Sequence, residues 1–173
     1  MKNWIKVLLF CFSCTIFIGC DRVTKIIAKE NLVYGEEISY FHDTFRLQYV
    51  ENTGAALSMG DNLPKAISFW LLSMIPLGVL IALFIYVIMR LNKMTRVMFF
   101  SFSLIIAGGL GNIIDRILYD RHVSDFMNIG IYNLRSGIFN VADICITVGA
   151  VGLFIAYYRD KNTTETADIN IAA

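Results

Sequence analysis

The longest uncharged stretch of this chain sets the strongest limit on its fold. Ala66 to Met89 reads AISFWLLSMIPLGVLIALFIYVIM, which is longer than the roughly 20 residues that an α-helix needs to cross a bilayer. Two further apolar stretches follow it, and the last carries a single acid, Asp143. Another lies near the N-terminus. We therefore predict an α-helical integral membrane protein with four transmembrane helices, at residues 4–20, 66–89, 97–114 and 138–158.

Composition agrees with a membrane protein and excludes a nucleic-acid partner. Of the 173 residues, 57% are hydrophobic and 17% are charged, against about 25% charged residues in a typical soluble domain. The formal net charge is +1, and no stripe of Lys and Arg offers a surface for phosphates. We assign residues 1–161 to a single membrane domain and expect a monomer surrounded by membrane lipid.

The first apolar segment has an alternative interpretation. With Lys2 and Lys6 before it, the sequence ending in Gly19-Cys20 resembles a bacterial lipoprotein signal peptide, which is cleaved before the cysteine. However, Phe17 stands where leucine is usual, and a secreted lipoprotein would not carry three further spans. We therefore expect a retained helix, with a cleaved lipoprotein as the alternative.

Basic residues near the ends of the spans predict the orientation. They precede the first span, fill the turn between the second and third, and follow the fourth: Lys2, Lys6, Arg90, Lys93, Arg96, Arg159 and Lys161. Because cytoplasmic loops are enriched in Lys and Arg, both termini should be cytoplasmic, and residues 21–65 and 116–137 should face outward. Residues 162–173 show no pattern, so we expect a disordered cytoplasmic tail.

The outer segments carry strand patterns. Phe45, Leu47 and Tyr49 alternate with polar residues, and the preceding EEISYF is a suitable partner strand with HDT as the turn. The second outer segment, FMNIGIYNLRSGIF, has similar short pieces. We predict a small extracytoplasmic β-sheet that lies on the outer membrane surface.

Polar residues inside apolar spans mark the candidate chemistry, because an intramembrane acid is costly to insert. Asp143 has no basic residue within its own span, and Asn140 lies on the same face if both are helical. Gly108, Asn112 and Asp115 fall on one stripe of the third span. Further acids and a polar turn lie outside the spans, at Asp120, Asp125, Asn52 and Gly54.

Structural roles are the alternative for several of these residues. Asn112, Asn140 and the glycines could only pack helices. Asp115 could pair with the adjacent Arg116 at the interface, and Asp21 could brace Lys25 one helical turn later. Residue chemistry by itself leaves Asp115, Asp120 and Asp125 open as the partner of Asp143.

Other catalytic designs lack the residues they need. His42 and His122 are far apart and have no metal-ligand spacing. All four cysteines lie in predicted spans, where small apolar packing roles are common. No serine-nucleophile motif or glycine-rich phosphate loop is present. Acids therefore remain as the chemical groups, and we expect no metal and no cofactor.

Five motifs together resemble lipoprotein signal peptidase, also called signal peptidase II. They are DRVTK (21–25), ENTGAA (51–56), GNIIDR (111–116), VSDF (123–126) and FNVAD (139–143). The motifs occur in the right order over nearly the whole chain. The resemblance implies an aspartic endopeptidase of the bacterial inner membrane, with its active site near the outer face. Such an enzyme removes signal peptides from diacylglyceryl-modified prolipoproteins, cutting before the lipidated cysteine.

The resemblance also implies residue roles. The catalytic aspartates of the family match Asp125 in V-x-D-F and Asp143 in F-N-x-A-D. Positions that shape or support the site match Asp21, Lys25, Asn52, Asn112, Arg116 and Asn140. We add Gly54, Gly108 and Asp115 to this supporting set from their positions in the same motifs or spans. Two adjacent carboxyl groups would share one proton and divide the acid and base roles.

Two other classes of function remain as alternatives. A non-enzymatic membrane scaffold would need neither Asp125 nor Asp143, whereas a small transporter would need Asp143 alone. An aspartic peptidase needs both.

Overall fold

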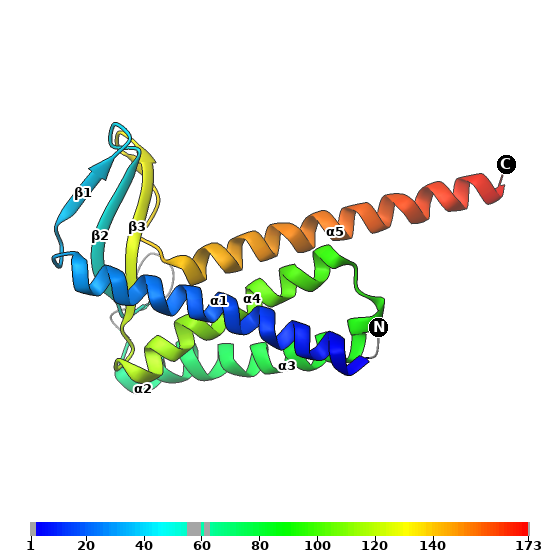
Figure 1. Ribbon diagram of the computed structural model, residues 1–173, viewed down its shortest axis with the longest axis horizontal. Helices are drawn as coiled ribbons and strands as arrows, with labels where there is room; N and C mark the ends of the chain where they lie inside the picture. The colour runs from blue at the N-terminus through cyan, green and yellow to red at the C-terminus, as the bar shows by residue number, and fades with distance from the viewer. Residues whose placement is uncertain (1–2, 55–59, 61–62, 173) are drawn as a thin grey trace.

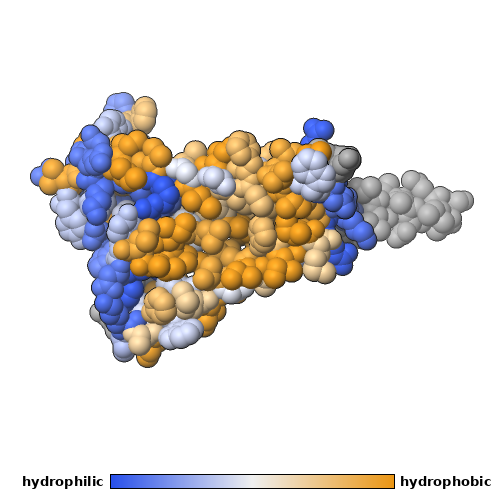
Figure 2. Space-filling model, turned by 60° about the horizontal axis from the view of Figure 1, so that its bottom comes forward, coloured by the Kyte–Doolittle hydropathy of each residue, from blue (hydrophilic) through white to orange (hydrophobic). Residues whose placement is uncertain are grey.

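The computed structural model describes residues 3–54, 60 and 63–172, and it contains a bundle of helices with a β-sheet across one end (Figure 1). Four helical segments are long and apolar enough to cross a membrane: Asn3–Asn31, Lys65–Lys93, Arg96–Leu118 and Val141–Asp160. Figure 2 shows the resulting surface, a broad apolar belt with hydrophilic residues at both ends. The prediction of four spans with a small sheet is confirmed.

Helix α1 (Asn3–Asn31) and helix α4 (Arg96–Leu118) both extend beyond their predicted spans. Hydropathy places the end of the first span at residue 20, because Asp21 and Lys25 follow. In the structure these two charges lie on the buried face of the same helix and neutralise each other, with Lys25 Nζ 2.8 Å from Asp21 Oδ2. The helix therefore continues past them.

The second span consists of consecutive helical pieces: α2 (Lys65–Phe69), the π-helical turn η2 (Trp70–Met74), α3 (Ile75–Arg90) and the 3₁₀ turn η3 (Leu91–Lys93). Pro76 lies in the first turn of α3. Proline has no N–H to donate to the residue four positions earlier. The turn before it is wider than an α-helical turn, and in it Ile75 N donates to Trp70 O, five positions earlier.

Helix α5 spans Val141–Ala172, so it begins later and ends later than the predicted span. Residues 138–140 are not helical. Asn140 therefore precedes the helix that holds Asp143, which differs from our expectation of one shared helical face. The segment for which we expected a disordered tail continues α5, and it contains no Gly or Pro that would end a helix.

The sheet has four antiparallel strands in the order β1 (Glu37–Tyr40), β2 (Phe45–Asn52), β3 (Val123–Ile131) and β4 (Leu134–Arg135). The predicted pairing of 36–41 with 45–49 is confirmed, with Tyr40 opposite Phe45 and a turn between them. Strand β3 starts at Val123, earlier than the predicted pieces, so Asp125 lies in a strand and not in a loop.

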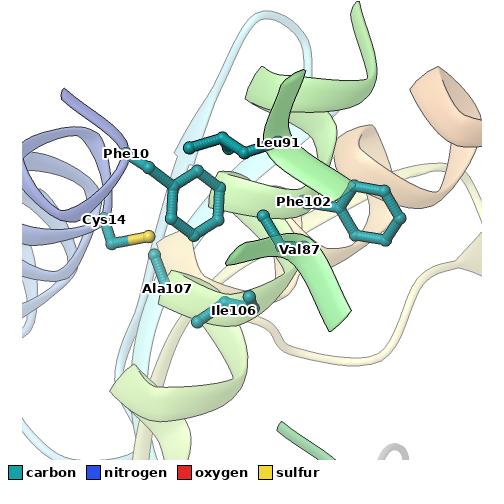
Figure 3. Packing of buried hydrophobic residues seen from close by; sticks show 7 residues of the cluster. All are labelled: Phe10, Cys14, Val87, Leu91, Phe102, Ile106 and Ala107. Carbon is teal, nitrogen blue, oxygen red and sulfur yellow. The ribbon is translucent and has the colours of Figure 1, made fainter. Parts of the chain in front are cut away.

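The apolar core fills the half of the bundle away from the sheet. Figure 3 shows its members, which come from α1, α3, η3 and α4: Phe10, Cys14, Val87, Leu91, Phe102, Ile106 and Ala107. Phe10 is fully buried and contacts the rings of Phe84 and Phe99 at centroid distances of 6.0 and 5.4 Å. Cleavage before Cys20 would remove Phe10 from this core, which favours the retained first helix.

Glycines allow α4 and α5 to approach closely. A Cβ at Gly108 would overlap the carbonyl oxygen of Ala142, and one at Gly149 would come within 2.7 Å of Ser101 O. Backbone atoms cannot move aside as a flexible side chain can, so both positions require glycine for this packing.

We expect Gly108→Ala to lower the free energy of unfolding by about 1–3 kcal/mol, the usual cost of overpacking. Gly78→Ala is the matched control, since no atom lies within 4 Å of a Cβ there. The alanine should be neutral or slightly stabilising in that helix. Thermal unfolding of both variants in detergent measures the difference, and an equal response would show that α4 and α5 can separate without cost.

Candidate active site

Two carboxyl groups from different elements face the same cavity at the sheet end of the bundle. Asp125 lies on β3 and is 3% exposed, whereas Asp143 lies in the first turn of α5 and is half-buried. Both line the cavity. Of the three acids that residue chemistry left open, Asp125 is the one that lies with Asp143.

Asp143 belongs to a reciprocal cap at the start of α5. The backbone N–H of Asn140 donates to Asp143 Oδ2 at 3.0 Å, and the backbone N–H of Asp143 donates to Asn140 Oδ1 at 3.1 Å. This is the geometry of a capping box, in which each side chain accepts from the other residue's otherwise unpaired N–H. The helix cap therefore fixes the position of the Asp143 carboxylate.

Asp125 accepts hydrogen bonds from two side-chain amides. Asn140 Nδ2 donates to its Oδ1 at 2.6 Å, and Asn52 Nδ2 donates to its Oδ2 at 3.0 Å. Burial is the largest influence on this group and raises its pKa to about 6, and the charge of Asp143 acts in the same direction. The two amide hydrogen bonds oppose the shift. Asn140 thus connects the two carboxyl groups directly.

A β-bulge brings Asn52 to this face. Leu47 pairs with Met127 and Val50 pairs with Asp125, so three steps along β2 match two steps along β3. Because successive side chains in a strand point to opposite faces, one extra residue reverses the facing of everything after it. Asn52 consequently lies on the same face of the sheet as Asp125. Without the bulge, Glu51 would lie there instead.

The amide of Asn112 is held in one orientation. Its Oδ1 accepts from Lys25 Nζ at 3.0 Å and from Asn140 Nδ2 at 3.1 Å. Its Nδ2 must therefore face the other way, where it donates to Asp143 Oδ1 at 2.8 Å. Lys25 does not contact either acid of the pair, but it determines which end of Asn112 does.

A buried ion network lies behind the amides. Lys25, 3% exposed, has both Asp21 Oδ2 and Asp115 Oδ2 within 2.8 Å of its Nζ, and Arg22 also pairs with Asp115. Asp21 Oδ1 accepts from the backbone N–H of Ala142 at 2.9 Å. The suggestion that Asp21 braces Lys25 is confirmed. The suggestion that Asp115 pairs with Arg116 is wrong, because successive helical residues point in different directions.

Arg116 has a different task in the same site. Its Nη2 donates to the carbonyl oxygen of Gly54 at 2.9 Å, and Gly54 N donates to Asn52 Oδ1 at 2.9 Å. These bonds hold the turn that ends β2, and they orient the Asn52 amide so that its Nδ2 faces Asp125. Arg116 also lines the cavity.

Two of the sequence candidates, Asp120 and Gly108, belong neither to the cavity lining nor to the hydrogen-bond and ion-pair network around the two acids. Asp120 is exposed and pairs with Lys65 at 2.7 Å, and this hydrogen-bonded ion pair lowers the pKa of Asp120. It is therefore a charged surface group. Gly108 packs against α5 and supports the site only through that contact. Within the described residues, no three His, Cys, Asp or Glu side chains come together as a metal site.

The cavity measures about 900 Å³ and has two chemically different parts. The polar part contains the two carboxyl groups with Asn52, Asn112 and Arg116. The apolar part runs between α3 and α5 over α4, and is lined by residues that include Leu72, Pro76, Val79, Gly109, Ile144 and Val148. If an extended or helical apolar segment of another molecule filled this part, a polar bond at the end of that segment would lie next to the two carboxyl groups.

Several functional contacts carry no signal in the sequence. The bulge in β2, the bond from Ala142 N to Asp21 and the contact of Lys25 with Asn112 join residues that are far apart in the chain. The asparagine and aspartate of FNVAD could have suggested a helix cap, since Asn followed three residues later by an acid is a capping pattern.

We expect Lys25→Met to lower stability by about 3–5 kcal/mol, because it leaves Asp21 as an uncompensated buried charge and removes one of the two cations that pair with Asp115. Activity should fall as well, since Asn112 loses a donor that fixes its amide. Lys29→Met is the matched control, one turn further along α1, where the lysine side chain is 57% exposed. Thermal unfolding in detergent should separate the two variants, and equal midpoints would contradict the role given to Lys25.

The chain is similar to known proteins in both sequence and fold. Residues 13–159 match the sequence model of a family described as signal peptidase (SPase) II. A lipoprotein signal peptidase of Borrelia duttonii (strain Ly) is 34% identical over 157 residues, covering 86% of this chain and 90% of that protein. One of Clostridium tetani is 37% identical over 141 residues, covering 81% and 86%.

A solved structure described as a bacterial membrane enzyme has a similar fold. It superposes with a TM-score of 0.75 at 29% identity and covers 90% of each chain. A second structure with the same description gives 0.73, covering 88% of this chain and 94% of the other.

Proposed function

Because the chain belongs to the signal peptidase II family, a membrane peptidase family that removes signal peptides from prolipoproteins, we propose that Asp125 and Asp143 are its catalytic pair. The observation that carries this proposal is the bridge through Asn140, which donates to one carboxyl group from its side chain and to the other from its backbone. Both acids also line one cavity.

The environments of the two acids support different roles. Asp143 lies at the N-terminus of α5, where helix N–H groups favour a negative charge, and both of its oxygens accept hydrogen bonds. Asp125 is buried on a strand, and its raised pKa means that it keeps its proton to a higher pH than an ordinary aspartate does. We assign Asp143 as the base that takes a proton from the attacking water, and Asp125 as the acid that protonates the scissile carbonyl oxygen.

The reaction then proceeds by proton exchange within the pair. Water oxygen bonds to the carbonyl carbon as its proton passes to Asp143, and the carbonyl oxygen takes the proton of Asp125. Collapse of the tetrahedral intermediate breaks the C–N bond, the proton held by Asp143 goes to the leaving nitrogen, and Asp125 recovers its own. The fixed amides of Asn52, Asn112 and Asn140 keep both carboxyl groups in place through these steps.

The apolar part of the cavity supports a lipidated substrate. We propose that the enzyme cuts before a diacylglyceryl-modified cysteine, with apolar groups of the precursor between α3 and α5 and the scissile bond at the polar end. Burial of acyl chains contributes roughly 0.8 kcal/mol per CH₂, so an unlipidated precursor should bind much more weakly.

The basic residues at the ends of the spans support an orientation. We propose that both termini are cytoplasmic, that the sheet and the two acids lie at the outer face of the bacterial inner membrane, and that the chain works as a monomer within membrane lipid. Each of the cytoplasmic ends then carries Lys or Arg.

We expect Asp125→Asn and Asp143→Asn each to reduce cleavage of a lipidated prolipoprotein by roughly 10²–10⁴-fold or more. The double variant should be scarcely slower than either single one, because the two groups act as a unit. Asp120→Asn is the matched control and should leave the rate unchanged, since that acid is exposed and pairs only at the surface. Asp115→Asn should mainly reduce the yield of folded protein.

Folded Asp125→Asn protein that cleaves at the parent rate would contradict the assignment. If, in addition, Asp143→Asn protein had lost function, the transporter alternative would gain support. Parent rates in both variants would favour a scaffold.

The raised pKa of Asp125 predicts the pH dependence of cleavage. In the free enzyme, kcat/KM should fall as the pH rises through the region of about 6, where Asp125 loses its proton. Bound substrate excludes water from the cavity and disfavours the charged form further, so the alkaline limb of kcat should lie at higher pH than that of kcat/KM. Steady-state rates across pH measure both limbs, and coincident limbs would contradict burial as the cause of the shift.

A further inference from the structure

Two hairpin tips of the sheet present large apolar side chains to the outside. The turn between β1 and β2 carries Phe41, which is 78% exposed. The turn between β3 and β4 carries Tyr132, which is 88% exposed, and Leu134, the first residue of β4, is 86% exposed. Surface apolar residues are common singly, but three of the four most exposed large ones in the described part of the chain lie at these two adjacent tips, and the fourth is Met89 on α3.

The backbone of both turns is unfavourable for these residues. Phe41 has a φ of 51° and Tyr132 a φ of 50°, in the left-handed region that glycine adopts freely. Bulky side chains are rare there, and such strain persists where something else offsets it. Because each ring is mostly exposed, packing inside the chain supplies little of that compensation.

The charges near the tips neutralise one another. Asp43 pairs with Arg46 at 2.6 Å and with Arg135 at 3.3 Å, and Arg46 also pairs with Glu37 at 2.7 Å. Arg46 holds the pKa of Asp43 well below its usual range, so the acid stays charged and paired. Two acids and two bases thus form a closed set, as a region of low dielectric constant requires.

The two tips act as one structural unit beside the bundle. Gly130 N donates to Thr44 O at 2.9 Å, and Arg135 Nη1 donates to Asp43 O at 2.8 Å, so the turns are bonded to each other. In Figure 1 the strands run across the ends of the helices, and the tips extend sideways past the start of α5. Further along α5, Val148, Val151 and Ile155 are exposed apolar residues.

We propose that the paired hairpin tips are a membrane anchor whose partner is lipid. Phe41, Tyr132 and Leu134 enter the interfacial region of the leaflet at the sheet end of the spans, beside the lipid that surrounds α5. Aromatic side chains are enriched at this depth, where an apolar ring and a polar hydroxyl are both accommodated. The proposal depends neither on which side of the membrane the sheet faces nor on the catalytic assignment.

The anchor has a consequence for the site. Strand β3 carries Asp125 and leads directly to one of the tips, whereas Asp143 is on a transmembrane helix. Fixing the tip at the lipid surface therefore fixes the height of the strand acid relative to the helix acid.

Tryptophan fluorescence in vesicles tests the anchor. The background is the full chain with Trp4→Phe and Trp70→Phe, which removes both native tryptophans. Tyr132→Trp is then added and the protein is reconstituted into phosphatidylcholine–phosphatidylglycerol vesicles with bromine on the acyl chains near the headgroup. We expect blue-shifted emission that loses much of its intensity to these lipids, less to deeply brominated ones, and little to aqueous iodide.

Glu36→Trp is the matched control, because Glu36 is exposed and lies before the opposite end of β1 from the tip. Its emission should stay red-shifted and be quenched by iodide. Equal iodide quenching of Trp at 132 and at 36 would overturn the anchor. So would protection at 132 that appears only after a prolipoprotein is added, or only at high protein density, since these would assign the tips to a substrate or to a second copy.

Discussion

A lysine buried between two aspartates is the constraint on which the rest of this structure depends. An isolated charge inside an apolar helix bundle is very costly, and a partner reduces the cost only when the geometry is good. Lys25 meets this requirement with Asp21 on its own helix and Asp115 on α4, each within 2.8 Å. Since Asp21 also accepts from Ala142 N, the same few groups set the packing of α1, α4 and α5. Removing any one of them would leave another charge or N–H unpaired.

The catalytic proposal uses parts that the fold already needs. Helix α5 requires a cap for its first N–H groups, and Asn140 with Asp143 provides it. The cap places one carboxyl group at the cavity, and the remaining N–H groups of Asn140 reach Asp125 and Asn112. A helix start, a strand and a buried ion network therefore meet at one asparagine, whose side chain is fully buried. This arrangement links the stability of the fold to the position of the two acids.

The two ends of the bundle divide structural and chemical tasks. Away from the sheet, aromatic and aliphatic side chains around Phe10 pack α1, α3 and α4 together (Figure 3). Near the sheet, polar side chains replace them, and α3 and α5 leave a cavity between them. Close packing at the glycines of α4 and α5 keeps the wall of the cavity in place. The apolar half can thus hold the helices while the polar half stays open to a substrate.

The sequence by itself determined the four spans and the first hairpin. Hydropathy and the alternation of Phe45, Leu47 and Tyr49 are local properties that do not depend on how the chain packs. The VSDF and FNVAD motifs also pointed to Asp125 and Asp143 through family resemblance. Residue chemistry without that resemblance could not choose among Asp115, Asp120 and Asp125, because all three are acids near the end of one span.

Tertiary structure decided which of these three acids lies beside Asp143 and which contacts surround it. Because α1 packs against α4, Asp115 forms an ion pair with Lys25, whereas Asp120 pairs with Lys65 at the surface. Strand β3 pairs with β2, and Asp125 on β3 accepts a hydrogen bond from Asn140. The bulge in β2 decides that Asn52 and not Glu51 faces this acid. The physical reason is that the ion-pair partner of a side chain, and the face of the sheet on which it lies, depend on the register between elements distant in the chain. Hydropathy and strand alternation depend only on neighbouring residues.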